Sequence, residues 1–521
     1  MHKEESFVFR PNIHYVIDYN TALNFPEYFD PTADLPERHL IISDLYQRAA
    51  HRMSGEKTDR GVAASELIAH LKNITTYGHE STLGKTAVKV YTINNLSVAF
   101  DYDEHKYSGA RIEGEHLMNS IALSEHWGGL LGNDNVVLLT NSSEMKPSTI
   151  YKPNLNVITA SPAPYTGYYR TESENAIAFW QRYKKMPLDV WQEESPNTDP
   201  LKPHEFILFG HARGNSFGHI GRYDAATETI VPLTYYQNIS GIKPIGERQA
   251  MAFEAMMAPA SIISTVILYG NAGSGKTFST VSAALAQTSI MDSTRVIDSD
   301  HESDNNANRK GARRKRNKAD KADNANCAKE KDTPLLFIPE PKELKTYPYQ
   351  GVSVCLPDGM LGRDLGAVPG DKRAKLNDKA DAYRDNIRNF LRTLNDKARG
   401  GRQASESNIA YRAEAIFNRF ELCTPGQING RDFWNRFIIC DEAQFNSLAQ
   451  LKAFIERCDI GTKIVFCGDP SQVDNPFGWY GNPLMRAVRY LSKDPSVAII
   501  CFDGGNIIRP GAQIIARSWP R

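Results

Sequence analysis

The sequence predicts an α/β protein whose C-terminal half is built on a doubly wound parallel sheet. In that half, four short apolar runs alternate with segments that have helical spacing; the runs are 265–269, 437–440, 463–467 and 497–502. Near-continuous apolar runs of this kind are typical of strands that are buried on both faces. Strand and helix patterns also alternate in the N-terminal part of the chain. This repeated order favours parallel sheets in both halves.

The N-terminal alternation can be followed element by element. The apolar runs expected to form strands are 14–18, which ends in an acid, 40–42 and 136–140, and the segments with helical spacing are 62–71 and 113–124. We therefore expect a small α/β domain with a parallel sheet over residues 1–160.

Changes in composition divide the rest of the chain. Residues 161–240 combine a stretch rich in Pro, Tyr, Thr and Asn with short strand patterns at 206–209 and 229–231, so a small β-rich connector is expected there. Residues 241–521 carry the parallel-sheet pattern. Within them, about 299–332 is almost without apolar residues and is rich in Asn, Ala, Lys, Arg and Asp, which predicts a disordered insertion.

The overall composition excludes several classes of protein. The chain has 521 residues, of which 41% are hydrophobic and 23% charged, so wholesale disorder, collagen and coiled coil are excluded. Its 61 Lys and Arg balance 61 Asp and Glu, and no global field therefore draws it to nucleic acid or membrane, although a local basic groove stays compatible with that balance. No apolar run approaches the ~18 to 20 residues that span a bilayer. The seven cysteines include no CxxC pair, and we expect a cytoplasmic protein with reduced thiols and no membrane partner.

Residues 270–277, GNAGSGKT, fit the phosphate-binding pattern GxxxxGK[ST]. An apolar strand pattern leads into the run and a helix pattern leads out, which is the structural context that the motif needs. Glycines allow backbone N–H groups to face phosphate oxygens, Lys276 would reach the β- and γ-phosphates, and the Thr277 hydroxyl would bind Mg²⁺. The residues expected to contact the nucleotide are Gly270, Asn271, Ala272, Gly273, Ser274, Gly275, Lys276, Thr277 and Phe278.

Two acids, Asp441 and Glu442, directly follow the apolar run 437–440. An acid at the end of a buried strand is costly unless it has a function. We expect Asp441 to hold Mg²⁺, directly or through water, and Glu442 to polarise the attacking water. The Asp-Glu pair favours hydrolysis over transfer to a small acceptor. Gln472, in the run GDPSQ after the following strand, is expected to sense the γ-phosphate and the water.

Two further residues are candidates for the same site. Gln249 lies 21 residues before Gly270, where a glutamine that recognises adenine would favour ATP; a surface glutamine at the start of a helix is the alternative. Arg509 follows the last predicted strand and is a candidate arginine finger, offered to the nucleotide of a neighbouring subunit. A plain surface arginine is the alternative at that position.

A second nucleotide motif is present but badly placed. Residues 317–320, NKAD, match the guanine-recognition pattern NKxD. They lie within the low-complexity insertion, no strand pattern precedes them, and they come before Asp441 in the chain. This position disfavours a GTPase.

These motifs resemble those of the PhoH-like ATPase family. The run DEAQFNSLAQLKAFIERCDIGTKIVFCGDPSQVDNP, residues 441–476, is similar to the most distinctive block of that family. GIKPIGERQ at 241–249 and GRDLGAVPGDKRAKLNDK at 362–379 resemble further family segments. The order DEAQ and then GDxxQ also resembles superfamily 1 helicase-like motors. The resemblance covers about 241–521 without the insertion, and it implies a RecA-like P-loop core, ATP hydrolysis, a link to RNA and ring assemblies.

The N-terminal domain resembles the PIN domain that some PhoH-like proteins carry, a metal-dependent ribonuclease fold with clustered acids. VIDYNTALNFP at 16–26 is similar to the opening PIN strand, and Asp18 matches its first acid. The resemblance implies that Asp44 and Glu115, or Glu113 in its place, are further ligands of Mg²⁺ or Mn²⁺. At the expected fourth acid the chain has Ser142, with Glu144 nearby as a candidate substitute. An active nuclease and an eroded PIN-like fold therefore both remain open.

Together these features predict an ATP-hydrolysing motor that acts on single-stranded RNA and is coupled to a PIN-like domain. A homo-oligomeric ring is expected, with a hexamer as the candidate size, and Arg509 would act in trans. One alternative is a ribonuclease that is regulated by nucleotide and has no motor activity. The other is an ATP-gated assembly or stress-response scaffold that does not process RNA.

Overall fold

The structure is a computed structural model, and it describes the chain with gaps. The described residues are 9–33, 35–54, 59–83, 86, 88–103, 115–140, 156–159, 165–196, 200–211, 217–237, 239, 242–292, 347–357, 359–360, 363–364, 381–397, 404–428, 430–472 and 482–502. The predicted insertion at 299–332, the NKAD run and the candidates Glu113, Ser142, Glu144 and Arg509 lie outside these residues.

Two compact units make up the chain. The first contains residues 1–164, 447–449 and 473–486, and the second contains 165–446, 450–472 and 487–521. The segment expected as a β-rich connector therefore lies in the same unit as the segment that carries the P-loop motif.

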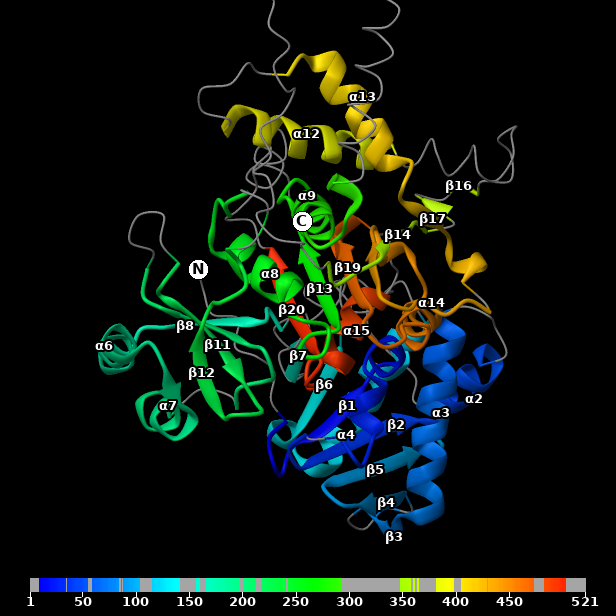
Figure 1. Cartoon of the computed structure of the whole chain (residues 1–521). Helices are drawn as coiled ribbons and strands as arrows, with labels where there is room; N and C mark the ends of the chain where they lie inside the picture. The colour runs from blue at the N-terminus through cyan, green and yellow to red at the C-terminus, as the bar shows by residue number, and fades with distance from the viewer. Residues whose placement is uncertain are drawn as a thin grey trace, which may run out of the picture. The chain divides into compact units, whose positions relative to one another are not determined.

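A seven-stranded sheet forms the centre of the first unit, with the strand order β3-β4-β5-β2-β1-β6-β7 (Figure 1). The strands are β1 (His14–Ile17), β2 (Arg38–Ser43), β3 (His79–Thr82), β4 (Lys89–Ile93), β5 (Leu96–Asp101), β6 (Val136–Thr140) and β7 (Asn156–Thr159). The five strands from β5 to β7 run parallel, whereas β3 and β4 extend the sheet as an antiparallel meander from β5. The parallel order follows from the strand–helix alternation in the sequence.

Helices connect these strands and bury their apolar sides. They are α1 (Tyr19–Asn24), α2 (Asp44–Met53), α3 (Asp59–Tyr77) and α4 (Glu115–Leu131). Trp127 of α4 is fully buried and packs with Val16, Ile41 and Leu138 from three neighbouring strands. A separate cluster that includes Leu67 of α3 covers other strand side chains. Burial of apolar surface on both faces explains why these strands are almost continuously apolar.

The second unit begins with a five-stranded sheet in the order β8-β10-β11-β12-β9. Its strands are β8 (Tyr168–Thr171), β9 (Met186–Pro187), β10 (Phe206–Phe209), β11 (Ile220–Asp224) and β12 (Thr229–Pro232), and its helices are α6 (Glu174–Tyr183) and α7 (Leu188–Glu194). Trp180 stacks on Phe209 with ring centroids 4.4 Å apart, and Trp191 meets the same ring edge-on. This aromatic core gives the small sheet its own apolar centre.

A six-stranded parallel sheet carries the rest of the second unit, with the order β17-β14-β18-β19-β13-β20. The strands are β13 (Thr265–Gly270), β14 (Gly351–Cys355), β17 (Glu421–Cys423), β18 (Arg436–Cys440), β19 (Lys463–Gly468) and β20 (Val497–Phe502), and β15 (Gly359–Met360) and β16 (Arg363–Asp364) form a separate hairpin. The four apolar runs of this half are β13, β18, β19 and β20. The predicted α/β class with a parallel sheet is therefore confirmed.

After β12, the described residues form six helices: α8 (Glu247–Met257), α9 (Lys276–Ala286), α12 (Asp381–Lys397), α13 (Glu406–Phe417), α14 (Leu448–Glu456) and α15 (Pro483–Leu491). α9 packs against β18, β19, α8 and α12, so it lies over the middle of the sheet. Buried Lys463 caps the end of α8, because its Nζ donates to the carbonyls of Ala255 and Ala258 at 3.0 and 2.6 Å. Burial lowers the pKa of this lysine to about 7.

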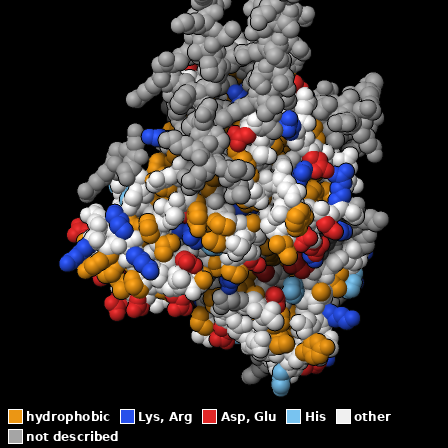
Figure 2. Space-filling model, in the orientation of Figure 1, with side chains coloured by type: hydrophobic (Ala, Val, Ile, Leu, Met, Phe, Trp, Pro, Cys, Tyr) orange, Lys and Arg blue, Asp and Glu red, His pale blue; other side chains and the backbone are white. Residues whose placement is uncertain are grey.

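The chain has no net charge, because its 61 Lys and Arg equal its 61 Asp and Glu. On the face in Figure 2, blue basic and red acidic side chains are interspersed with apolar ones. Within the described part of the chain, no helix is both long and apolar enough to cross a membrane. All six cysteines in that part are free thiols.

Candidate nucleotide site at the carboxyl edge of the six-stranded sheet

The P-loop run forms a tight turn between the end of β13 and the start of α9. Gly270, Gly273 and Gly275 have φ angles of 132°, 75° and 91°, a region that side chains with a Cβ rarely adopt. A Cβ on Gly270 would also collide with the backbone carbonyl of Phe502. The glycines of the motif are therefore required by the backbone path, and that path brings the loop to the N-terminus of α9.

The Lys276 side chain lies inside this loop. Its Nζ donates to the carbonyls of Gly270 and Asn271 at 2.7 and 2.8 Å and to the Ser274 hydroxyl at 3.3 Å. Burial lowers the pKa of Lys276, and the surrounding acids, Asp469 first, oppose that shift. These neutral acceptors hold the ammonium group where anionic phosphate oxygens would be stronger partners.

The Thr277 hydroxyl faces the Asp441 carboxylate, with separations of 3.3 and 3.1 Å from Thr277 Oγ1 to Asp441 Oδ1 and Oδ2. Thr277 lies in the first turn of α9 and Asp441 follows β18, so parallel strands bring them to one edge of the sheet. A hydroxyl beside a carboxylate offers the hard oxygen ligands that Mg²⁺ prefers, and the ion would keep several waters. The pair therefore fits a divalent cation.

Burial raises the pKa of Asp441, and the backbone amide of Glu442 is the first of several groups that oppose the shift. Another opposing group is the hydroxyl of Tyr383, a fully buried residue of α12. Sequence reasoning missed Tyr383, because nothing in a helix pattern indicates which sheet edge its side chain meets. A bound cation would favour the ionised form of Asp441.

Glu442 follows Asp441 in a left-handed conformation, with φ at 51°. Such a backbone is uncommon for a residue with a Cβ and is found where the surroundings hold it in place. Burial and then the Asp441 charge raise the pKa of Glu442, and a hydrogen bond from Gln444 opposes them. Glu442 is half-buried at the edge of the site, a position suited to a water-polarising base.

Gln472 reaches the loop indirectly. Its Nε2 donates to Asp469 Oδ2 at 3.1 Å, and the same oxygen accepts from the backbone N–H of Ala272 at 2.7 Å. Asp469 was not among the predicted site residues. The signal that marks it is its position directly after β19, the strand that pairs with β13 and therefore ends beside the P-loop.

Gln249 and Phe278 were also predicted to contact the nucleotide. Gln249 is 6% exposed in α8, and its Oε1 accepts from the backbone N–H of Ile245 at 2.9 Å. This bond fixes the side chain near the start of α8 and leaves the amide N–H₂ as the group for recognition. Phe278, in the first turn of α9, packs against the large apolar core.

The first unit brings its acids to one sheet edge. Asp18 follows β1 and Asp44 follows β2, and these two strands run parallel, so both positions lie at their carboxyl ends. Glu115 begins α4. A fourth acid, Asp101, ends β5 beside Ser43, but its Oδ2 accepts from Trp127 Nε1 at 2.8 Å. The side chains of Asp44 and Glu115 lie outside the part of the chain that the structure describes. Among the described side chains, no group of three or more His, Cys, Asp or Glu is arranged to hold a metal.

The Asp18 carboxylate is already engaged as the N-cap of α1. It accepts from the backbone N–H groups of Asn20 and Thr21 at 2.9 and 3.1 Å and from the Thr21 hydroxyl at 2.5 Å. The Thr140 hydroxyl donates to it as well. A carboxylate has about four acceptor positions, and these four donors occupy them. The geometry gives Asp18 a structural role in the first turn of the domain.

Asp18→Ala is expected to destabilise the first unit by about 1–2 kcal/mol, the usual cost of removing an N-cap. Thermal unfolding measures the loss, and Asp134→Ala, at an exposed residue, is the matched control that should change little. Mn²⁺ should not raise the melting temperature of the wild type more than that of Asp18→Ala. A rise seen only in the wild type would instead identify Asp18 as a metal ligand.

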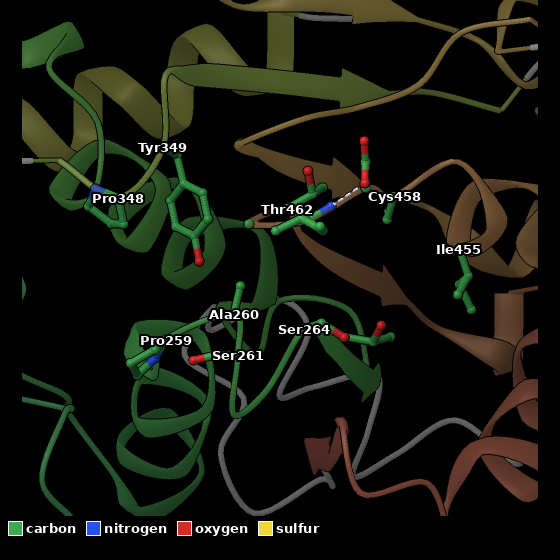
Figure 3. A pocket seen from close by; sticks show the side chains of 13 residues that line it. Pro259, Ala260, Ser261, Ser264, Pro348, Tyr349, Ile455, Cys458 and Thr462 are labelled. Atoms are coloured by element: carbon green, nitrogen blue, oxygen red, sulfur yellow. Dashed lines mark hydrogen bonds between the residues drawn. The ribbon is translucent and has the colours of Figure 1, made fainter.

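A cavity of about 650 Å³ lies at the other edge of the six-stranded sheet (Figure 3). Thr265 and Thr462, at the amino ends of β13 and β19, line it together with Tyr349. Ligands of open parallel sheets bind outside the carboxyl ends of the strands. We therefore assign the candidate nucleotide site to the P-loop edge and not to this cavity.

Comparison with known proteins finds similarity between the C-terminal part of the chain and PhoH-like proteins. Residues 344–517 match the family model described as PhoH-like protein. Protein PhoH2 of Bacillus subtilis is 26% identical over 277 residues, which cover 53% of this chain and 47% of that protein. A PhoH-like protein of the same organism is 30% identical over 148 residues, covering 28% of this chain and 41% of that protein. Protein PhoH of Escherichia coli K12 is 30% identical over 146 residues, 28% of this chain and 37% of that protein.

In each of these comparisons the chain spans less than half the length of the curated relative. The family match includes Asp441, Glu442, Asp469 and Gln472 but begins after the P-loop run. The low-complexity segment between the P-loop and residue 344 separates the two halves of the site in the sequence, whereas the fold joins them through neighbouring strands.

Proposed function

We propose that this chain, which carries a PhoH-like domain at residues 344–517, is a Mg²⁺-dependent ATPase. The observation that carries the proposal is the pairing of Thr277 with Asp441 beside a glycine loop that holds the Lys276 ammonium group. A hydroxyl, a carboxylate and a lysine converge where a nucleoside triphosphate and its metal would need them.

Each residue has a distinct part in the proposed reaction. Lys276 exchanges its carbonyl partners for phosphate oxygens and binds the β- and γ-phosphates. Thr277 and Asp441 would hold Mg²⁺, and the ion would supply positive charge beside the phosphates. Glu442 accepts a hydrogen bond from the attacking water and orients it. Gln472 is placed at the rim, where it can respond to the γ-phosphate through Asp469.

We propose that Gln249 sets the preference for adenine. Gln249→Ala is expected to raise the KM for ATP roughly tenfold, since one or two hydrogen bonds of about 1 kcal/mol each are lost. The KM for GTP should change less, because the amide would not match guanine. Steady-state hydrolysis of both nucleotides measures the difference. Equal changes for ATP and GTP would contradict a role in base selection.

We propose that the ATPase uses the energy of ATP hydrolysis to remodel single-stranded RNA. The resemblance of the motifs to those of helicase-like motors supports this substrate, as does the parallel sheet of the first unit with its PIN-like acid positions. We further propose a homo-oligomeric ring, with a hexamer as the working size, in which Arg509 of one subunit faces the nucleotide of the next.

Ribonuclease activity of the first unit is the second candidate function. The shared sheet edge of Asp18 and Asp44 favours it, whereas the four donors around the Asp18 carboxylate oppose it. We therefore propose that the PIN-like unit binds or positions RNA without cutting it. The scaffold alternative differs in that RNA would leave the rate of ATP hydrolysis unchanged.

One experiment separates these functions. ATP hydrolysis by the purified full chain is measured with Mg²⁺, with EDTA and with or without single-stranded RNA, and the integrity of the RNA is followed in the same samples. We expect hydrolysis that EDTA abolishes and RNA stimulates, with the RNA intact. Hydrolysis insensitive to RNA would favour the scaffold. Metal-dependent RNA cleavage without ATP hydrolysis would favour the nuclease, and an absence of both would overturn the proposal.

A further inference from the structure

Gln444 connects the two strand ends that supply the candidate site. It lies in the short 3-10 turn Ala443–Phe445 after β18 and is 2% exposed. Its Nε2 donates to Glu442 Oε2 at 2.7 Å, and its Oε1 accepts from the backbone N–H of Asp469 at 2.9 Å. One side chain therefore contacts the predicted base after β18 and the backbone after β19.

The neighbours of Gln444 determine which way its amide points. A backbone N–H can only donate, so the group that faces Asp469 has to be the amide oxygen. The amide nitrogen is thereby directed at the Glu442 carboxylate, where it can donate to either protonation state but favours the ionised one. An amide is well suited to this position, because a carboxylate or an aliphatic side chain supplies only one or neither of the two contacts.

Asp469 extends the connection to the nucleotide loop. Its Oδ2 accepts from the backbone N–H of Ala272 at 2.7 Å. Its Oδ1 accepts from the backbone N–H and the hydroxyl of Ser471 at 3.1 and 2.5 Å. The carboxylate is buried, at 5% residue exposure, and its orientation is fixed from both oxygens. Three consecutive hydrogen-bonded steps thus lead from Glu442 through Gln444 and Asp469 to the loop.

This chain of contacts matters because Glu442 is held under strain. Its backbone is left-handed, with φ at 51°. Without the donor from Gln444, the carboxylate would lose the contact that limits its rotation. The Asp469 N–H would at the same time become a buried donor without its Gln444 acceptor.

We propose that Gln444 is a positioning residue that ties Glu442 to the nucleotide loop through Asp469. The proposal deepens the proposed ATPase function and rests on it. Gln444 touches neither nucleotide nor water in this role. It holds the base at a fixed place relative to Ala272, so that occupation of the loop and orientation of the base are coupled through the end of β19.

The first test does not depend on activity. Hydrogen–deuterium exchange of the nucleotide-free full chain, resolved to the peptide that contains Asp469, reports directly on the amide that Gln444 accepts from. Gln444→Ala is expected to speed this exchange by about tenfold, since one hydrogen bond of about 1–1.5 kcal/mol is lost. Gln444→Glu keeps an acceptor for that amide and should leave the exchange close to that of the wild type.

The second test uses the other end of the side chain. Gln444→Glu removes the donor to Glu442 and keeps the acceptor for Asp469, so it should lower kcat about as much as Gln444→Ala does. Gln444→Ala should lower kcat by about 10- to 100-fold while the affinity for a fluorescent ATP analogue stays within about twofold. Gln192→Ala, an exposed glutamine of α7, is the matched control and should change none of these values.

The outcomes distinguish the positioning role of Gln444 from the proposed ATPase activity. Wild-type kcat in both Gln444 variants would overturn the proposal and leave the ATPase standing. Parallel losses of kcat, nucleotide affinity and melting temperature would also overturn it, because they indicate a merely structural residue. If the wild type hydrolyses no ATP but Gln444→Ala alone speeds the exchange of Asp469, the contact stands and the proposed ATPase fails.

Discussion

Lys276→Ala is expected to lower the affinity for ATP by at least about 100-fold, because two charge-assisted contacts worth about 1.5–3 kcal/mol each are lost. The structure places the ammonium group within the loop, 2.7 Å from the carbonyl of Gly270 and 2.8 Å from that of Asn271. The lysine thus needs little rearrangement to reach a phosphate. Titration of a fluorescent ATP analogue in the presence of Mg²⁺ measures the change.

The same substitution should leave the fold nearly intact. Burial disfavours the charged form of Lys276, so its removal relieves that cost while the loop carbonyls become free to meet water. Lys452→Ala is the matched control, since Lys452 lies on α14 with a side-chain exposure of 74%. An affinity of Lys276→Ala within about threefold of the wild type would exclude the loop as the phosphate site, because a charge-assisted contact is worth more than that.

The elements that the sequence predicted best are those whose pattern is local. The four apolar runs of the C-terminal half became β13, β18, β19 and β20 because each is buried on both faces. The glycine loop follows β13 as its spacing requires. Thr277 and Asp441 come together because parallel strands with crossover helices align their carboxyl ends. The two local motifs therefore predicted the central pair of the candidate site, and the parallel strands bring its members together.

The residues that were missed have no local signal. Tyr383 of α12 is close enough to Asp441 to influence its pKa, but the helical pattern of α12 indicates an apolar side and not which residues that side meets. Gln444 and Asp469 lie within the quoted motifs, yet their contact joins a side chain after one strand to a backbone N–H after the next. Such contacts depend on the order β18-β19-β13. Strand order of this kind is set by tertiary packing and not by spacing along the chain.

For the acids of the first unit, the sequence predicts where they lie but not which hydrogen bonds they make. Position along the sequence placed Asp18 after a strand, and the structure agrees. Position could not show that neighbouring donors fill the acceptor positions of its carboxylate, since one of them, Thr140, comes from the end of β6 on the adjacent strand. An acidic residue at the expected position is therefore not sufficient to make a metal site. Its carboxylate must also have acceptor positions that other donors do not occupy.

Glu442→Gln is expected to reduce kcat for ATP hydrolysis by roughly 1,000-fold, within the range lost when a general base is removed. Binding of ATP should stay within about twofold of the wild type, because the amide has nearly the same shape and its oxygen can still accept from Gln444 Nε2. Single-turnover hydrolysis together with analogue binding measures both effects.

The pH dependence of kcat provides a second test of this prediction. Burial and Asp441 raise the pKa of Glu442, so wild-type kcat should fall as the pH drops through that raised pKa and the base becomes protonated. The residual activity of Glu442→Gln should lack this limb, while Glu456→Gln, on the exposed side of α14 with 60% side-chain exposure, should keep it. If Glu442→Gln retained both rate and limb, the base would have to be another group. Asp469 would then be the first to test, since its carboxylate already contacts the loop.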